Sequence, residues 1–332
     1  MGAGSIADSG PERQVARGTP DAIPVSVVVM YPASASFRPR FGPAALALAA
    51  ALVAAPASVA SERGLGRGFD LEYGLRLAGL PIGRATLKGG LGEGRYRLDL
   101  DARLTGLAGW VAGIGGNGTS HGAAAGRRVI PSSYAVNIPE GRHPISLKVD
   151  LSGGNVVEAM LSPPLQPRPD RIPVLDTHKR GVVDPVGALL MLQPGRGPVL
   201  DPEACNRTLP IFDGAGRFDV RLTYASTKAI RIPGYEGPAL VCAARYVPIA
   251  GHRERSAVQF MRENRDMEAW LVPVAGARAL VPARITVGTR VGRLVIEARR
   301  IGGLSGTITA AAEPEDEARG ETAASPDPGR RR

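Results

Sequence analysis

The sequence GIGGNG at residues 113–118 matches the glycine pattern G-x-G-x-x-G, which cradles a pyrophosphate in dinucleotide-binding proteins. A true fingerprint follows a buried strand and opens a helix, because the amides at the helix N-terminus must point at the phosphate. Here the preceding TGLAGW is typical of a short helical turn, and the following TSHGAAAGRR has no apolar stripe at helical spacing. We therefore interpret the match as a flexible glycine-rich turn between strands, and we expect no cofactor.

Four histidines are candidates for acid–base chemistry, namely His121, His143, His178 and His252. They are scattered through locally polar stretches, where a solvated loop histidine is the default, and the chain lacks the H-E-x-x-H signature. Catalytic triads are recognised by geometry rather than by sequence order, so a non-local site stays open. The alternative function is therefore an envelope hydrolase or transferase that combines these histidines with strand carboxylates.

Two pairs of carboxylates could also serve acid–base catalysis, Asp99 with Asp101 and Asp70 with Glu72. Each pair alternates with apolar residues on a predicted strand, which favours a solvated charged face. Trp110 and Trp270 could stack a sugar ring, although core packing is the commoner fate of isolated tryptophans in apolar surroundings.

The two cysteines, Cys205 and Cys242, predict a disulfide if the protein is exported. The alternative is a redox or metal site, but neither cysteine lies in C-x-x-C and no histidine stands at ligand spacing. A bridge requires a Cα separation of about 5 to 6 Å, and a separation well above about 7 Å would exclude it. We expect no metal.

The segment FRPRFGPAALALAAALVAAPASVASE predicts export through a cleavable signal peptide. Arg38 and Arg40 supply the positive region, residues 44–55 the apolar stretch and residues 58–60 a small-x-small cleavage site, which places cleavage near Ala60. A membrane anchor is the alternative, but the apolar stretch is shorter than the roughly 20 residues that a spanning helix needs. The expected location is the periplasm.

An export signal normally starts near the N-terminus, whereas a polar stretch of residues 1–29 precedes this one. We therefore expect translation to start at Met30, and N-terminal sequencing of the precursor would decide between Met30 and Met1.

The formal net charge is +10, and the excess of basic residues lies between residues 61 and 312. The basic residues alternate with apolar ones, as in GRYRLDLDARL, and form no run interleaved with aromatics. This pattern indicates solvated strand faces and excludes a nucleic-acid groove as a partner site. Contact with an anionic membrane surface stays open, because such attraction needs only a local field.

Period-two alternation predicts antiparallel strands along most of the mature chain. It is clearest in FDLEYGLRL from Phe69 and YRLDLDARL from Tyr96. The stretch LPIFDGAGRFDVRL predicts a hairpin around Asp213 and Gly214, and EAWLVPV, ALVPARITV and GRLVIEARRI predict three further short strands.

One helix is predicted over residues 184–192. Asp184 can cap it, Pro185 suits its first position, VGALLML is apolar, and Pro194 prevents its continuation. The proline-rich residues 162–173 predict a long crossing loop or a linker between two halves of one barrel. We expect three regions: residues 1–60 as extension plus signal peptide, 61–312 as a single β-rich domain, and 313–332 as a disordered tail.

Several motifs occur in order between about Phe69 and Ile301, namely YGLRLAGLPIGRATL, DPVGALLML, LPIFDGAGRFDVRL, LVCAARYVPIAGHR and ARALVPARITVGTRVGRLVIEA. Together they resemble the domain-of-unknown-function family 3108, whose members are exported proteins of Gram-negative bacteria. The resemblance implies an envelope location and a β-rich fold, and it carries over no catalytic residue.

The predicted fold is mainly β, an antiparallel open barrel, half-barrel or β-spiral with one or two short helices. By fold-level analogy with periplasmic lipoprotein carriers, such a sheet could enclose an apolar concavity. The first functional hypothesis is a non-enzymatic periplasmic protein that binds a lipid, a lipoprotein-like ligand or an envelope partner. A structural scaffold in envelope maintenance is a third possibility. The candidate apolar lining residues are Leu71, Tyr73, Leu75, Leu98, Leu100, Leu189 and Leu190.

Overall fold

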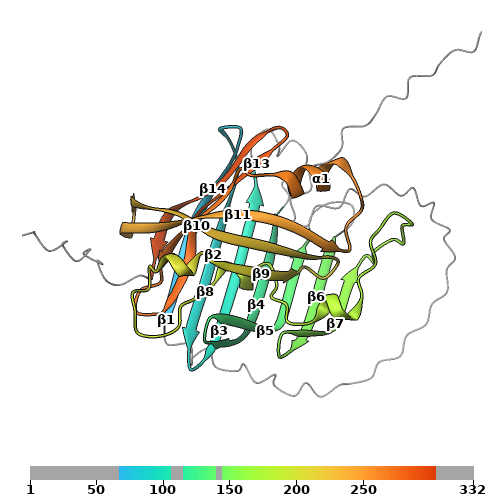
Figure 1. Ribbon diagram of the computed structural model, residues 1–332, viewed down its shortest axis with the longest axis horizontal. Coiled ribbons are helices and arrows are strands. Elements are labelled where there is room, and N and C mark those ends of the chain that lie inside the picture. Colours follow the sequence, from blue (N-terminus) through green and yellow to red (C-terminus); the bar gives the residue numbers. More distant parts are fainter. Residues whose placement is uncertain (1–66, 106–114, 140–143, 304–332) are drawn as a thin grey trace, which may run out of the picture.

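The computed structural model describes residues 67–105, 115–139 and 144–303, which form one antiparallel sheet of 14 strands. The first half is a meander in which each strand pairs with the next (Figure 1). Its strands are β1 (Arg67–Leu77), β2 (Leu80–Gly92), β3 (Arg95–Leu104), β4 (Gly115–Ala125), β5 (Arg128–Ile138), β6 (Ile145–Ser152) and β7 (Asn155–Ser162).

The second half extends the same sheet from the other side of β1, because β14 pairs with β1. Its strands are β8 (Met191–Leu192), β9 (Arg207–Phe212), β10 (Arg217–Ile232), β11 (Tyr235–Ala250), β12 (Met267–Pro273), β13 (Ala279–Thr289) and β14 (Gly292–Gly302). From β14 the order runs β13, β12, β11, β10 and β9, with β8 paired to β13. The long hairpin of β10 and β11 runs across the direction of the first-half strands in Figure 1.

The two edges of the sheet, β7 and β9, are joined by a crossing segment instead of a strand ladder. This segment, residues 163–206, contains the proline-rich stretch of the sequence. The backbone N–H of Val182 donates to Gly154 in the β6–β7 turn at 2.8 Å, and that of Val183 donates to Pro210 of β9 at 2.9 Å. The sheet is therefore an open barrel whose seam is filled by a loop, which confirms the predicted fold class.

The tip of the β10–β11 hairpin reaches back to β14, where the N–H of Ile301 donates to the carbonyl of Pro233 at 2.9 Å. Strands β10 to β14 thus curl toward closure at this end of the sheet. The turn between β9 and β10 lies against the first half, because Gly214 packs on the side chain of Leu147 in β6.

Period-two alternation gives the strands one buried face, as the sequence predicts. On β1, the side chains of Phe69, Leu71, Tyr73 and Leu75 are buried and the residues between them are more exposed. They belong to core cluster 1, which the two halves and the crossing segment build together. Core cluster 2 lies on the other face of β11 to β13 and includes Leu240, Leu271 and Leu280.

The prediction of a helix over residues 184–192 is wrong. The chain makes only a 3₁₀ turn, Gly187–Leu189, and then pairs residues 191 and 192 with β13 as β8. Asp184 does not cap a helix, and the N-cap position of the 3₁₀ turn is Val186. The Asp184 carboxylate nevertheless accepts the N–H groups of Val186 and Gly187 at 3.0 and 2.8 Å. Pairing with the start of β13 satisfies the following backbone better than a helix that Pro194 would soon stop.

The α-helix of the described chain is α1 (Ser256–Glu263), which the sequence analysis did not predict. Two further 3₁₀ turns are η2 (Asp176–Lys179) and η4 (Pro202–Ala204). Among the described residues, no helix is long and apolar enough to cross a membrane.

The prediction of a glycine-rich turn is also wrong for the part of residues 113–118 that the structure describes. Residues 115–118 are the first part of β4 and pair with β3, so they are strand and not turn. The predicted signal peptide, Trp110, His143 and the predicted tail lie outside the described residues.

Candidate functional site

The disulfide between Cys205 and Cys242 is present, as predicted, with a Cα separation of 5.3 Å. Cys205 ends the η4 turn and Cys242 lies on β11, and both are fully buried in core cluster 2. The bridge fastens the end of the crossing segment to the sheet. It has no free thiol to offer for redox or metal chemistry.

A buried polar network fastens the same segment inside core cluster 1. The hydroxyl of Ser120 donates to the carboxylate of Asp184 at 2.6 Å, and the hydroxyl of Tyr96 lies 2.9 Å from Ser120 Oγ. Asp184 is 2% exposed. Burial raises its pKa to about 6, although the hydrogen bonds from Ser120 and from the backbone oppose that rise.

Gly187 allows this network to form. A Cβ at this position would stand 2.8 Å from Asp184 Oδ2 and 3.2 Å from the hydroxyl oxygens of Ser120 and Tyr96. The close approach of the backbone therefore depends on the absence of a side chain.

The seven predicted lining residues lie together in the filled interior. Leu71, Tyr73, Leu75, Leu98 and Leu190 are members of core cluster 1, and Leu100 and Leu189 pack against it. None of the seven lines either of the two cavities that are described below, the Trp270 cavity and the Gln193 cavity. That the seven contact a ligand stays a prediction.

The histidines of the described chain lie apart from one another. His178 Nδ1 accepts the backbone N–H of Leu175, and His121 is exposed on β4. His252 Nε2 lies 3.4 Å from Glu254, and neither residue lines either cavity. Within the described ranges, no group of three or more His, Cys, Asp or Glu side chains is placed to hold a metal ion.

The strand carboxylates lie on charged faces and pair with arginine. Arg300 binds both Asp70 and Glu72, and Arg97 lies 3.0 Å from Asp99. This arrangement matches the solvated face that the alternation predicted.

The Trp270 cavity is the candidate functional site. It has a volume of about 220 Å³ and lies between the tip of β10 and strands β12, β13 and β14. Ile230, Ile232 and Ala283 form an apolar wall that is continuous with core cluster 1. Arg231, Arg284 and Glu297 complete the lining together with Trp270.

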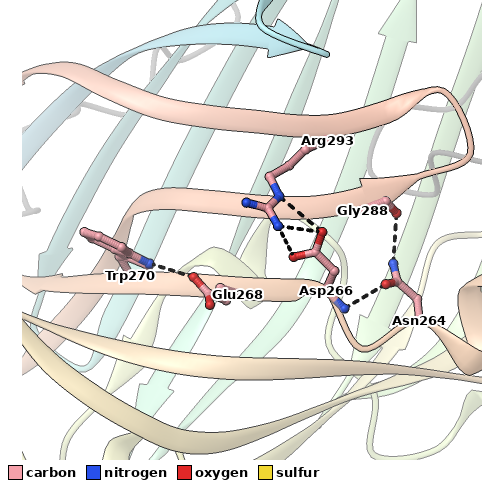
Figure 2. A network of polar contacts seen from close by, with 6 residues as sticks. All are labelled: Asn264, Asp266, Glu268, Trp270, Gly288 and Arg293. Carbon is pink, nitrogen blue, oxygen red and sulfur yellow. Dashed lines mark hydrogen bonds and ion pairs between the residues drawn. The ribbon is translucent and has the colours of Figure 1, made fainter.

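Polar contacts hold the Trp270 ring in place. Its indole N–H donates to Glu268 at 3.2 Å, as Figure 2 shows. Lys228 Nζ and Arg284 Cζ lie 4.8 and 5.1 Å from the ring centroid, within the range of cation–π attraction. Arg284 also lies 3.1 Å from Glu297, so an ion pair holds the Arg284 guanidinium beside the ring.

A second set of bonds fixes the start of β12 beside this site. Arg293 of β14 binds the carboxylate of Asp266 through two nitrogens, and the Asn264 amide donates to the carbonyl of Gly288 at 2.9 Å (Figure 2). The backbone N–H of Asp266 donates to Asn264 at 2.9 Å. Side-chain hydrogen bonds therefore hold the start of β12, the strand that carries Trp270, to β13 and β14.

Of the cavity residues, the sequence analysis singled out only Trp270. The alternation in AIRI carried a signal for Ile230 and Ile232, because it places both side chains on one strand face. Nothing local in the sequence joins them to Ala283, Arg284 and Glu297, which come from two other strands.

A protein-family model described as "Protein of unknown function (DUF3108)" matches residues 69–299. No curated protein matches the sequence. Two solved structures are similar: a β-barrel-like protein of domain of unknown function DUF1849 from Brucella abortus, and a candidate lipoprotein from Parabacteroides distasonis.

The first is 11% identical with a TM-score of 0.42 and covers 71% of this chain and 97% of that one. The second is 7% identical with a TM-score of 0.31 and covers 72% of this chain and 96% of that one. Likenesses of this size carry no argument about function.

Proposed function

Because the chain belongs to the DUF3108 family of proteins of unknown function, we propose from its own geometry that it is a non-enzymatic, exported envelope protein. In this proposal the Trp270 cavity holds the apolar end of a lipid or of a lipidated envelope partner. The buried disulfide supports export, since such bridges form and persist in oxidising compartments.

The observation that carries the proposal is the lining of the Trp270 cavity. An apolar wall with a few fixed polar groups is the usual composition of a small-molecule site. Its volume of about 220 Å³ lies below the range of roughly 300 to 1,000 Å³ that encloses a whole drug-sized ligand. The cavity therefore suits one end of a chain, with the headgroup outside near Arg231 and Glu297.

Tryptophan fluorescence tests the proposal directly. The chain has two tryptophans, so in a Trp110→Phe background the emission reports on Trp270. Titration with a lysophospholipid below its micellar concentration should give a saturable blue shift, because an acyl end would replace water near the ring. A shift that does not saturate, or none at all, would contradict the proposal.

Filling the cavity provides the matched control. Ala283 is fully buried in the wall, and Ala283→Leu should abolish the saturable shift. Ala229→Leu adds the same atoms at an exposed position on β10 and should bind like the parent. If the filled variant is too unstable, Ile232→Ala enlarges the cavity and should change the preferred chain length.

A structural scaffold is the second candidate, and the filled interior favours it. The predicted lining residues pack against one another and against the crossing segment. Deletion of the gene followed by complementation separates the two functions. Full rescue of an envelope defect by the Ala283→Leu variant would support the scaffold, and failure of rescue by a folded variant would support ligand binding.

A further inference from the structure

A second cavity, the Gln193 cavity, opens at a different place in the sheet and has a volume of about 350 Å³. Its walls come from the β2–β3 turn, the β4–β5 turn, the residues around the end of β8, and the turn before β13. Arg95, Gln193 and Arg278 are the charged or side-chain polar residues among those that line it, and no acidic residue does. The cavity shares no lining residue with the Trp270 cavity.

The positive charge of Arg278 is fixed in the wall without a carboxylate partner. Its guanidinium donates to the carbonyls of Gln193, Pro194 and Gly197 at 3.2, 3.0 and 2.8 Å, and it forms no ion pair with a described acid. Five N–H groups are available on a guanidinium, so donors remain after these three bonds. A fixed, uncompensated cation beside an open cavity attracts anions.

A second arginine, Arg207, adds positive charge beside the backbone of Leu192, next to Gln193. Arg207 donates to the carbonyl of Leu192 at 3.3 Å and to that of Ala204 at 2.8 Å, again with backbone oxygens as partners. Burial, with the nearby charge of Arg127 as a smaller cause, lowers the pKa of Arg207 to about 10. It still carries its charge at neutral pH.

Gln193 supplies the independent observation that points to a ligand. Its side chain is among the buried polar groups, with the residue 7% exposed, and its amide Nε2 has no hydrogen-bond partner. An unpaired buried donor costs about 1 to 3 kcal/mol. Because Nε2 itself has almost no exposed surface, the side chain must turn toward the cavity before an oxygen bound there can accept a hydrogen bond from it.

From these observations we propose that the Gln193 cavity binds a phosphate-bearing ligand. Gln193 and Arg278 supply donors from two walls, and Arg95 supplies more from a third, although its guanidinium also lies 3.5 Å from the exposed carboxylate of Glu93. A tetrahedral oxyanion presents acceptors in several directions. The phosphate group comes either from a small soluble phosphate compound or from a phospholipid headgroup. This site is independent of the Trp270 cavity.

Calorimetric titration at one fixed salt concentration tests the site with four probes. They are inorganic phosphate, glycerol 3-phosphate, phosphatidylglycerol vesicles and phosphatidylcholine vesicles. Binding of the soluble phosphates identifies a small-molecule ligand, whereas binding of phosphatidylglycerol vesicles alone identifies a lipid headgroup. All four probes carry phosphate, and the two kinds of vesicle differ in net charge. Failure of all four to bind at millimolar concentrations would overturn the proposal, as would binding that the cavity variants described below leave unchanged.

Two variants locate the binding within the chain. Arg95 is 68% exposed at its side chain and can be changed to Gln without loss of core packing, and Gln193→Met keeps the side-chain shape while removing the amide. The double variant should bind about tenfold more weakly, the range expected for loss of charge-assisted bonds. Arg278 is left intact because it also holds the backbone of residues 193–197.

Arg76→Gln is the matched control, since it removes one charge from an exposed position on β1 outside the cavity. The proposal is wrong if this control weakens binding as much as the Gln193 and Arg95 variants do. Ala283→Leu in the Trp270 cavity should leave phosphate binding unchanged. The two proposals can therefore fail separately.

Discussion

The crossing segment is attached to the sheet at two points of opposite chemistry. Near its middle, the carboxylate of Asp184 accepts hydrogen bonds from Ser120 and from two backbone amides within core cluster 1. At its end, Cys205 is covalently joined to Cys242 within core cluster 2. We call these the polar anchor and the covalent anchor.

The two anchors respond to different conditions. The polar anchor contains a buried group whose protonation changes in the mildly acidic range, whereas the covalent anchor changes only with redox conditions. The crossing segment is therefore attached covalently at its end, through Cys205, and near its middle by hydrogen bonds to Asp184 whose strength depends on pH. The packing of residues 182–192 against the sheet can therefore change while Cys205 stays bonded to Cys242.

The largest expected effect is loss of the covalent anchor. The Cys205→Ala/Cys242→Ala variant should lose about 4 kcal/mol of unfolding free energy, because the bridge closes a loop with a sequence separation of 37 residues. Urea unfolding with and without reductant measures the loss. Two reactive thiols per chain in the purified protein, or an unchanged unfolding midpoint after reduction, would show that this anchor does not stabilise the fold.

The covalent anchor was predictable from the sequence and the polar anchor was only half predictable. An even cysteine count and the alternation around Cys242 sufficed for the bridge, because disulfides follow compartment and strand pattern. Asp184 was predicted as a cap, but its partners Ser120 and Tyr96 lie 64 and 88 positions away on β4 and β3. The helix prediction failed for a related reason, since pairing of β8 with distant β13 overrode the local pattern.

The strands could be predicted because period-two burial is a local property, as in β1. The two cavities could not. Each combines residues from at least three separate elements, and their volumes depend on how the β10–β11 hairpin and the crossing segment pack. Helix α1 was missed because it has only 8 residues, fewer than the window of about 11 to 18 residues over which apolar periodicity indicates a helix, although Ala257, Phe260 and Met261 stand at helical spacing.

The next largest effect is the pH dependence of the polar anchor. Asp184 has a pKa of about 6 when folded, against an ordinary value of 3.8, so the native state binds the extra proton between these values. Its contribution to stability is therefore complete below about pH 4 and is lost as the pH rises through about 6. At about 1.4 kcal/mol per pH unit, the loss amounts to roughly 3 kcal/mol.

The Asp184→Asn variant isolates this effect. Asn keeps an oxygen for the two backbone amides and cannot ionise, so its stability relative to the parent should rise by roughly 3 kcal/mol between pH 4 and pH 7. Urea unfolding across this range measures the difference. The pKa of buried Asp213 is also raised, but that residue is present in both proteins and cancels. Parallel stability curves for parent and variant would contradict the assignment.

A smaller effect is expected from crowding the polar anchor. Gly187→Ala places a Cβ 2.8 Å from Asp184 Oδ2, which the backbone must move to relieve, at a cost of about 2 kcal/mol. Gly197→Ala is the matched control, because its Cβ would meet nothing within 4 Å. Thermal unfolding should place the Gly187 variant well below the parent and the Gly197 variant level with it. Equal midpoints for the two variants would show that the turn is not tightly packed.

The smallest effect concerns Ser120, which donates to the carboxylate at 2.6 Å and also contacts Tyr96. Ser120→Ala should cost about 1.5 kcal/mol at neutral pH, because one hydrogen bond to a charged acceptor is lost. That bond lowers the pKa of Asp184, so its removal should raise this pKa further and move the pH-dependent loss of stability upward. The variant should therefore be closest to the parent at pH 4, where Asp184 is protonated in both proteins.

Ser146→Ala on β6, an exposed position, is the control and should follow the parent at every pH. A Ser120 variant whose deficit is the same at pH 4 and pH 7 would mean that its hydroxyl acts only in packing, and the polar anchor would then consist of the backbone hydrogen bonds to Asp184 alone.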